Sequence, residues 1–391
     1  MKIALKRRMK TFFGLLFVIF QAQSATAWEL SDVSVLMPLP KVLSDASALL
    51  KTGDSGALGA LVPAEIVSQL PKLVFNRERA TTYNEELRAL SIRFDPCFTE
   101  GADPQPCRKQ VRIAWQPMVA KGVQVLTIDA ALHTFYEFDD AGFAKLMREY
   151  QALLTANPHP PLSVLDVNPR LRTQGLKGPF AKGFKALLLA HCGAQNLVRA
   201  TVMTLEEGNN DWKFMGWNIR GTVLTPISIA VVQAPLQELK TVLPVGFDLK
   251  AQVQPQGYSP VASQIYKDSL LARKSLSERE FSDFASAVLT IENPNRSNPG
   301  TVDCAACHMS GPGAQWLRLN FPAWNWASLV AQSGFSTKRD VRNVTLPSLK
   351  PRRFRAFGYF VSDPLISQRT INESALVADK LDQMFPQGAQ P

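Results

Sequence analysis

The stretch that most constrains this chain is Cys304-Ala305-Ala306-Cys307-His308, in which two thiols lie three positions apart and an imidazole follows directly. Random placement of the chain's cysteines and histidines would produce this pattern about 0.0007 times. Thiols at this spacing reach the two vinyl groups on one edge of a porphyrin, and the next side chain is then held where its nitrogen can bind iron. The sequence therefore predicts one haem, attached through Cys304 and Cys307, with His308 as the proximal iron ligand.

A zinc site is the alternative interpretation, but the motif offers three donors and no fourth at a recognisable spacing. The stretch resembles the attachment motif of bacterial c-type cytochromes, and this resemblance rests on five residues. It implies a monohaem protein that transfers electrons, with haem c as its one cofactor.

The sequence leaves the sixth iron ligand open. In small class I cytochromes, as the resemblance implies, this ligand is a methionine before the terminal helix, whereas only Met309 and Met384 follow the motif here. Met309 adjoins the proximal ligand, and Met384 falls on the apolar stripe of a predicted last helix, where core packing is expected. The remaining candidates are three histidines and three methionines: His133, His159, His191, Met118, Met203 and Met215.

Residues 1–27 have the pattern of a signal peptide. Five basic residues precede an apolar run over 12–20, which is short for a membrane span, and Ala25-Thr26-Ala27 has the small residues that a signal peptidase cleaves after. The alternative is an uncleaved membrane anchor. Because c-type haem is attached outside the bacterial cytoplasm, the motif and the leader both predict a periplasmic or secreted protein that begins at Trp28 and has no integral membrane segment.

The charge balance changes once the leader is removed. The whole chain carries +10, but the leader takes five of the 43 basic residues and none of the 33 acids, which leaves 38 against 33, or +5. This balance gives no reason to expect nucleic acid as a partner. It fits a redox partner protein with an acidic surface, or solubility alone.

The pattern of apolar residues predicts an α+β fold. We expect a signal peptide (1–27), an N-terminal arm (28–84), an α+β domain (85–245) with a mixed sheet and two helices, and a mainly helical, loop-rich haem-bearing region (246–391). Within the domain, alternation predicts strands near 90–94, 111–115, 123–128, 132–138, 197–205 and 212–218, and helices from 139 or 140 and over 179–191. The apolar run 223–233 predicts a strand buried on both faces.

Cys97 and Cys107 flank a Gly- and Pro-rich loop between the first two strands. In an oxidising compartment we expect them to form a disulfide. Two free thiols or a metal site are the alternatives. Cys192 is then left unpaired, as a small buried apolar residue.

In the haem-bearing region, Ser277 and Glu280 form a capping box for one helix, and Asn372 is expected to cap the last. The motif between them, followed by Gly311-Pro312-Gly313, suggests a haem on a loop between helices. Four aromatic residues predict either a wall of the haem pocket or ordinary core: Trp316, Phe321, Trp324 and Trp326. A basic cluster could pair with haem propionates, dock a partner or face solvent: Lys338, Arg339, Arg342, Lys350, Arg352, Arg353 and Arg355.

Three functions follow from these features. The first is an exported monohaem c-type cytochrome that transfers single electrons. The second is a peroxidase-like haem enzyme, which needs an open sixth position and a distal acid or base that the sequence does not assign. The third is a haem-based sensor or binding protein.

Overall fold

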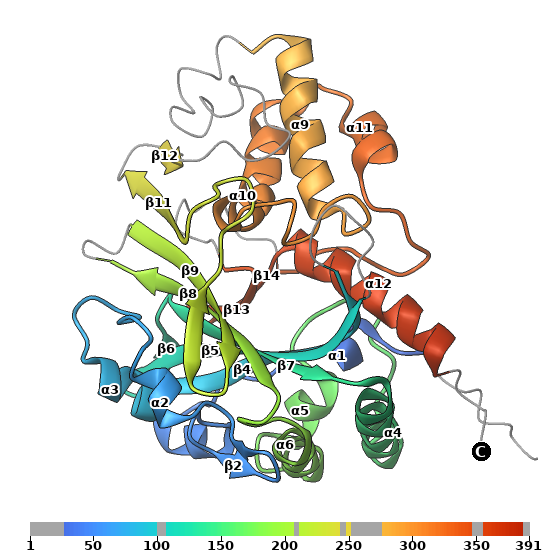
Figure 1. The fold of residues 1–391 in the computed structure, drawn as a ribbon. Helices are drawn as coiled ribbons and strands as arrows, with labels where there is room; N and C mark the ends of the chain where they lie inside the picture. The colour runs from blue at the N-terminus through green and yellow to red at the C-terminus, as the bar shows by residue number, and fades with distance from the viewer. Residues whose placement is uncertain are drawn as a thin grey trace, which may run out of the picture.

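The computed structural model describes residues 27–99, 107–206, 211–242, 248–251, 276–345 and 355–385. The predicted signal peptide lies almost entirely outside these residues. The fold is α+β, as predicted, and is built around a ten-stranded sheet in the described part of the chain (Figure 1). The main path of the sheet runs β1 (Ser34–Leu36), β4 (Leu87–Phe98), β5 (Arg108–Lys121), β7 (Ala131–Phe138), β8 (Leu197–Leu205), β9 (Asp211–Arg220), β11 (Leu236–Val242) and β12 (Asp248–Ala251).

Every ladder between these strands is antiparallel, where the sequence predicted a mixed sheet. Two shorter strands extend it, because β6 (Gln124–Thr127) pairs with β5 and β10 (Val223–Pro226) pairs with β9. The antiparallel order follows from short connections such as those between β4 and β5 and between β8 and β9, since a parallel pair needs a crossover of a dozen residues or more.

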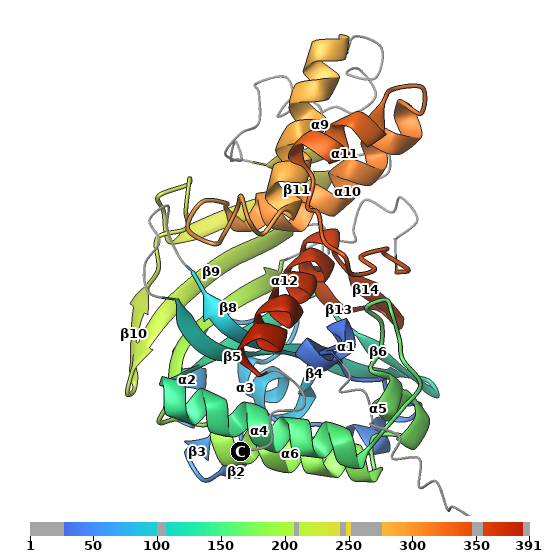
Figure 2. The ribbon, with the colours of Figure 1, turned by 90° about the vertical axis from the view of Figure 1, so that its right-hand side faces the viewer.

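One face of the sheet is covered by α4 (Asp140–Ala156) and α6 (Pro179–His191), which lie side by side (Figure 2). Both helices agree with the sequence prediction, and Asp139 caps the first by accepting a hydrogen bond from the Gly142 amide at 2.7 Å. Aromatic packing joins this layer, because Phe94 of β4 stacks on Tyr150 at 4.7 Å between ring centroids. The residues that alternate with Phe94 point to the opposite face of the sheet.

Residues 28–84, predicted as an arm, contribute a strand to the sheet, because β1 pairs with β4. Trp28 is fully buried, and its backbone nitrogen lies 2.9 Å from Oδ1 of Asp382. Short elements complete this half of the chain: α1 (Leu30–Val33), the 3₁₀ helix Leu43–Ala48, β2 (Ser55–Gly56), β3 (Gly59–Ala60), α2 (Ala64–Val67), α3 (Arg79–Thr81), the π-turn Thr82–Glu86 and α5 (Pro169–Gln174).

The prediction of a doubly buried strand over 223–233 is wrong. Only β10 is extended there, and its first residue, Val223, is 62% exposed. Residues 227–230 instead line the cavity described below. Their apolar side chains cover an internal space, a role that the hydrophobic pattern does not distinguish from burial inside a sheet.

The other face of the sheet carries the C-terminal elements (Figure 2). They are α9 (Glu278–Glu292), α10 (Cys304–Asn320), α11 (Trp326–Ser333), the hairpin of β13 (Phe357–Phe360) and β14 (Asp363–Ile366), and α12 (Gln368–Met384). The capping box of Ser277 and Glu280 is present at the start of α9, as predicted. None of the described helices is long and apolar enough to span a membrane.

Two local predictions in this region are wrong. The motif is not on a loop but opens α10, since Asp303 caps that helix and Gly311-Pro312-Gly313 continues it. The last helix begins after Ser367, which accepts from the Thr370 amide, so Asn372 lies inside it and donates to the Glu292 carbonyl at 2.8 Å.

The predicted disulfide between Cys97 and Cys107 is present and joins the ends of β4 and β5. The bond spans ten positions, and closing a loop of that size stabilises a fold by about 3 kcal/mol through the unfolded state. The double variant Cys97→Ala/Cys107→Ala should lose about this much unfolding free energy in urea. Dithiothreitol should destabilise the parent protein by a similar amount and leave the variant unchanged; equal sensitivity of both proteins would contradict this role.

Candidate haem site

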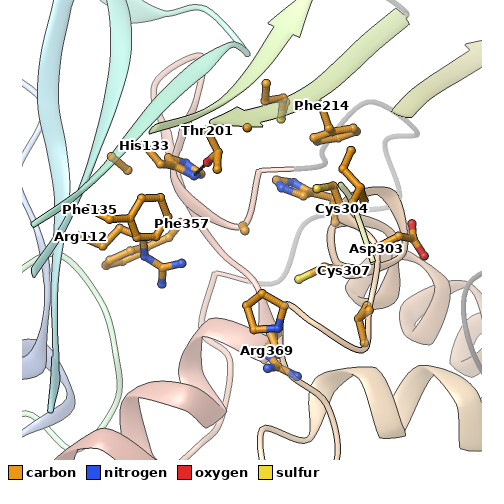
Figure 3. A pocket seen from close by; sticks show the side chains of 18 of the residues that line it. Arg112, His133, Phe135, Thr201, Phe214, Asp303, Cys304, Cys307, Phe357 and Arg369 are labelled. Atoms are coloured by element: carbon orange, nitrogen blue, oxygen red, sulfur yellow. Dashed lines mark hydrogen bonds between the residues drawn. The ribbon is translucent and has the colours of Figure 1, made fainter. Parts of the chain in front are cut away.

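The three donors of the motif share one cavity, about 260 Å³ in volume, between α10 and the sheet (Figure 3). Cys304, Cys307 and His308 all line it. Residues at spacings of three and four lie on one face of a helix, so the first turns of α10 present both thiols and the imidazole to the same side. Helix formation therefore arranges the motif for a single flat ligand.

The start of α10 is tied to the edge of the sheet through a buried glutamine. Gln237 of β11 donates to Oδ1 of Asp303 at 2.5 Å and accepts from the amide of Ala305 at 2.9 Å. Asp303 Oδ1 also accepts from the amide of Ala306 at 2.9 Å. This network fixes the first turn of the helix, and with it the two cysteines, relative to β11.

The sheet wall of the cavity is organised in cross-strand rows. Residues directly opposite each other on adjacent strands share a face, and five of them form a row of small side chains around one imidazole. This row consists of Ser91, Ala114, His133, Thr201 and Gly216, and every member lines the cavity.

A cationic row lies beside it, two residues along each strand. Arg93, Arg112, Phe135 and Arg199 are opposite one another on β4, β5, β7 and β8. The guanidinium groups of Arg112 and Arg199 each lie 6.0 Å from the centre of the Phe135 ring. On the other side of the small row, Met203 is opposite Phe214, whose ring is 5.0 Å from that of His308. The wall thus changes from cationic to apolar across its width.

A half-buried carboxylate from α12 holds the cationic row. Glu373 accepts hydrogen bonds from Arg93 and, at 2.6 Å, from Arg369, and it lies 4.0 Å from Arg112. Burial alone would raise the pKa of Glu373, but these three guanidinium groups outweigh it and hold the pKa well below its usual range. The pKa of Arg112 is lowered, first by burial and then by Arg93.

These residues fit a haem. Arg355 adds a further cation to the cavity: its Nη2 donates to Asp129 at 2.7 Å, whereas its buried Nε has no hydrogen-bond partner among the described residues. An unpartnered guanidinium nitrogen and a row of arginines suit the two propionates of a haem, and the Met203 and Phe214 side suits its apolar edge. The cationic and apolar sides of the cavity therefore match the two ends of the expected cofactor.

The structure separates the candidates for the sixth ligand. His133, Met203 and Met215 line the cavity. His159 instead lies 3.4 Å from Glu29, and His191 lies 2.7 Å from Glu149. Met118 and Met309 are buried elsewhere, and Met384 is 43% exposed, so the expected core role of Met384 is wrong.

Three of the four aromatic residues after the motif, Phe321, Trp324 and Trp326, do not line this cavity. Phe321 and Trp324 pack on Phe281 of α9, with ring centroids 5.4 and 4.2 Å away, which favours the core interpretation. Trp326 is also near Phe281, at 6.3 Å, and the side chain of Trp316 lies outside the described part of the structure.

The basic cluster is divided among several roles. Arg355 lines the cavity, Arg339 bonds to Asp379 and Asp382, and Arg342 bonds to Asp340, with Lys338 exposed beside them. Lys350, Arg352 and Arg353 lie outside the described residues. The sequence patterns did not single out Arg93, Arg112 and Arg199, which alternate with apolar residues in the predicted strands.

His308 also lines a second cavity, of about 210 Å³, together with Glu292, Arg318 and Arg355. Glu292 is 4% exposed, and its Oε1 has no hydrogen-bond partner in the described residues. Burial raises the pKa of this carboxyl to about 7, although Arg318 and Arg369 lower it.

Comparison with known protein families, curated proteins and solved structures found no match for this chain. Within the described residues, no group of three or more His, Cys, Asp or Glu side chains is arranged to hold a metal ion directly.

Glu292 predicts a pH-dependent stability. The pKa of Glu292 is about 7 in the folded protein and 4.5 in the unfolded chain. Ionisation of Glu292 therefore destabilises the folded state. This destabilisation is negligible below pH 4.5, increases between pH 4.5 and pH 7, and reaches its full size above pH 7. Glu292→Gln should therefore stabilise the protein by about 3 kcal/mol at pH 8 and change little at pH 4, measured by urea unfolding. Glu278→Gln, an exposed position of the same helix, is the control. A gain that does not depend on pH would contradict this assignment.

Proposed function

We propose that this chain is an exported monohaem c-type cytochrome that transfers single electrons. The observation that carries the proposal is the common cavity, in which two thiols and an imidazole from α10 face a wall of arginines and apolar residues. Cys304 and Cys307 hold the haem through thioether bonds, and His308 is the proximal ligand. A bound haem supplies a reversible one-electron couple between ferric and ferrous iron.

The surrounding residues position the cofactor and set its environment. Arg112, Arg199 and Arg355 stabilise the propionates, while Met203 and Phe214 exclude water from the opposite edge. Burial of this kind and nearby positive charge both favour the reduced, less positive iron, and so raise the reduction potential. The electron comes from, and passes to, a redox partner protein, for which an acidic surface would match the net charge of +5.

Export is part of the proposal, and the buried N-terminal end supports it. Signal peptidase cleavage after Ala27 would turn the backbone nitrogen of Trp28 into an ammonium group. That nitrogen lies 2.9 Å from Oδ1 of Asp382, whose other oxygen accepts from Arg339 at 2.5 Å. A new positive charge would therefore be formed beside a carboxylate. The Cys97–Cys107 disulfide also fits export, because disulfides are stable in the oxidising periplasm or outside the cell.

A peroxidase-like enzyme is the second candidate, and one observation favours it. His133 and Arg112 share the cavity, and the pKa of His133 is held well below its usual value by burial and then by the charges of Arg112, Arg355 and His308. A neutral imidazole can accept a proton from peroxide, and a guanidinium can stabilise the resulting anion. This enzyme, like a haem sensor, requires that the iron keep an open sixth position.

Covalent attachment tests the main proposal. Protein isolated from the periplasm of a host that matures c-type cytochromes should keep haem after denaturing electrophoresis, detected by haem staining. The double variant Cys304→Ala/Cys307→Ala should lose the stain completely, because no other thiols line the cavity among the described residues. Cys192→Ala, a buried thiol elsewhere, should stain like the parent. Absence of haem from the parent, or retention by the double variant, would contradict the proposal.

A further inference from the structure

One histidine stands across the cavity from the motif. His133 lies on β7, near the middle of the sheet, and Figure 3 shows it on the sheet side of the cavity, with Cys304 and Cys307 on the helix side. Of the four histidines in the chain, it alone shares this cavity with His308. The two imidazoles come from elements about 170 positions apart in the sequence, so only the fold brings them to one space.

The neighbours of His133 leave room above the sheet. Ala114 and Thr201 are directly opposite it on β5 and β8, and both are small. A planar group can therefore approach the imidazole without meeting a bulky side chain in the same row. The large members of the wall, Phe135 and Phe214, belong to the rows on either side.

The imidazole of His133 is in a suitable state to bind a metal. Its Nδ1 lies 3.5 Å from Oγ1 of Thr201, and its Nε2 makes no hydrogen bond among the described residues. Burial lowers the pKa of His133, and the charges of Arg112, Arg355 and His308 lower it further.

The methionines of the wall are less well placed. Met203 lies in the row of Phe214, whose ring packs against that of His308, whereas His133 lies in the next row among small side chains. Met215 also borders the cavity, but it follows Phe214 on β9, so strand alternation directs its side chain toward the other face of the sheet.

We propose that His133 is the sixth ligand of the haem iron, on the opposite side from His308. This inference rests on the proposed function, because it requires haem at Cys304 and Cys307. It deepens that function in one respect: an iron with two histidine ligands is low-spin and has no open coordination position. This ligation favours the electron carrier, because a peroxidase-like enzyme or a sensor would first have to displace His133.

The test uses the purified holoprotein. Electron paramagnetic resonance and near-infrared magnetic circular dichroism of the oxidised protein should report a low-spin iron with two histidine ligands. His133→Ala should become high-spin. Its reduced form should bind carbon monoxide at least roughly tenfold more tightly, because carbon monoxide no longer has to displace an internal ligand from the iron. Added imidazole should restore the low-spin spectrum of this variant.

Two matched variants serve as controls. His159→Ala removes a histidine outside the cavity, and Met203→Leu removes the competing thioether; both should keep the parent spectrum. A parent iron that is high-spin, or that has one histidine and one methionine ligand, would overturn the inference, and this result does not depend on whether His133→Ala folds. If haem is attached but His133 is not a ligand, the inference fails and the proposed function stands. If the parent protein carries no covalent haem, both fail.

Discussion

The arrangement of this cavity depends on one half-buried carboxylate. Glu373 of α12 bonds to Arg93 of the sheet and to Arg369 of its own helix. Arg369 in turn donates to the carbonyls of Ile291, at the end of α9, and Ser297, in the segment that leads to the motif. The carboxylate thus joins the sheet to the region that carries the two cysteines. Breaking such a buried pair typically costs 3–5 kcal/mol, because an uncompensated charge remains.

The same interaction makes a cationic cavity possible. Five arginines line the cavity, and without a counter-charge their mutual repulsion and burial would oppose folding. Glu373 and Asp95 offset part of this charge, and Asp129 offsets that of Arg355. The remaining positive charge is directed at the cavity, where the proposed haem brings two carboxylates. On this account, binding of the cofactor completes the charge balance of the fold as well as providing the redox centre.

The sequence analysis succeeded where local patterns decide the structure. The α+β class, the helices from Asp140 and Pro179, the hairpin of β8 and β9 and the disulfide all follow from periodicity and spacing. The rest depends on tertiary context. Arg93 and Arg112 have the pattern of solvent-facing strand residues, and only the packing of α12 and α10 over that face turns them into cavity wall. Similarly, Ile227, Ile229 and Ala230 line the cavity and do not lie inside a sheet. His133 shares a cavity with the motif only because β5, β7 and β8 pair in one particular register. No local sequence pattern contains that register.

The central claim is that one iron lies in this cavity, between α10 and the sheet. A crystal structure of the holoprotein with anomalous diffraction measured on both sides of the iron absorption edge would test it most directly. The account predicts a single iron peak inside the cavity, within bonding distance of His308, with the cationic row near the propionates. An iron peak outside the cavity, or a haem whose propionates face Met203 and Phe214, would contradict it.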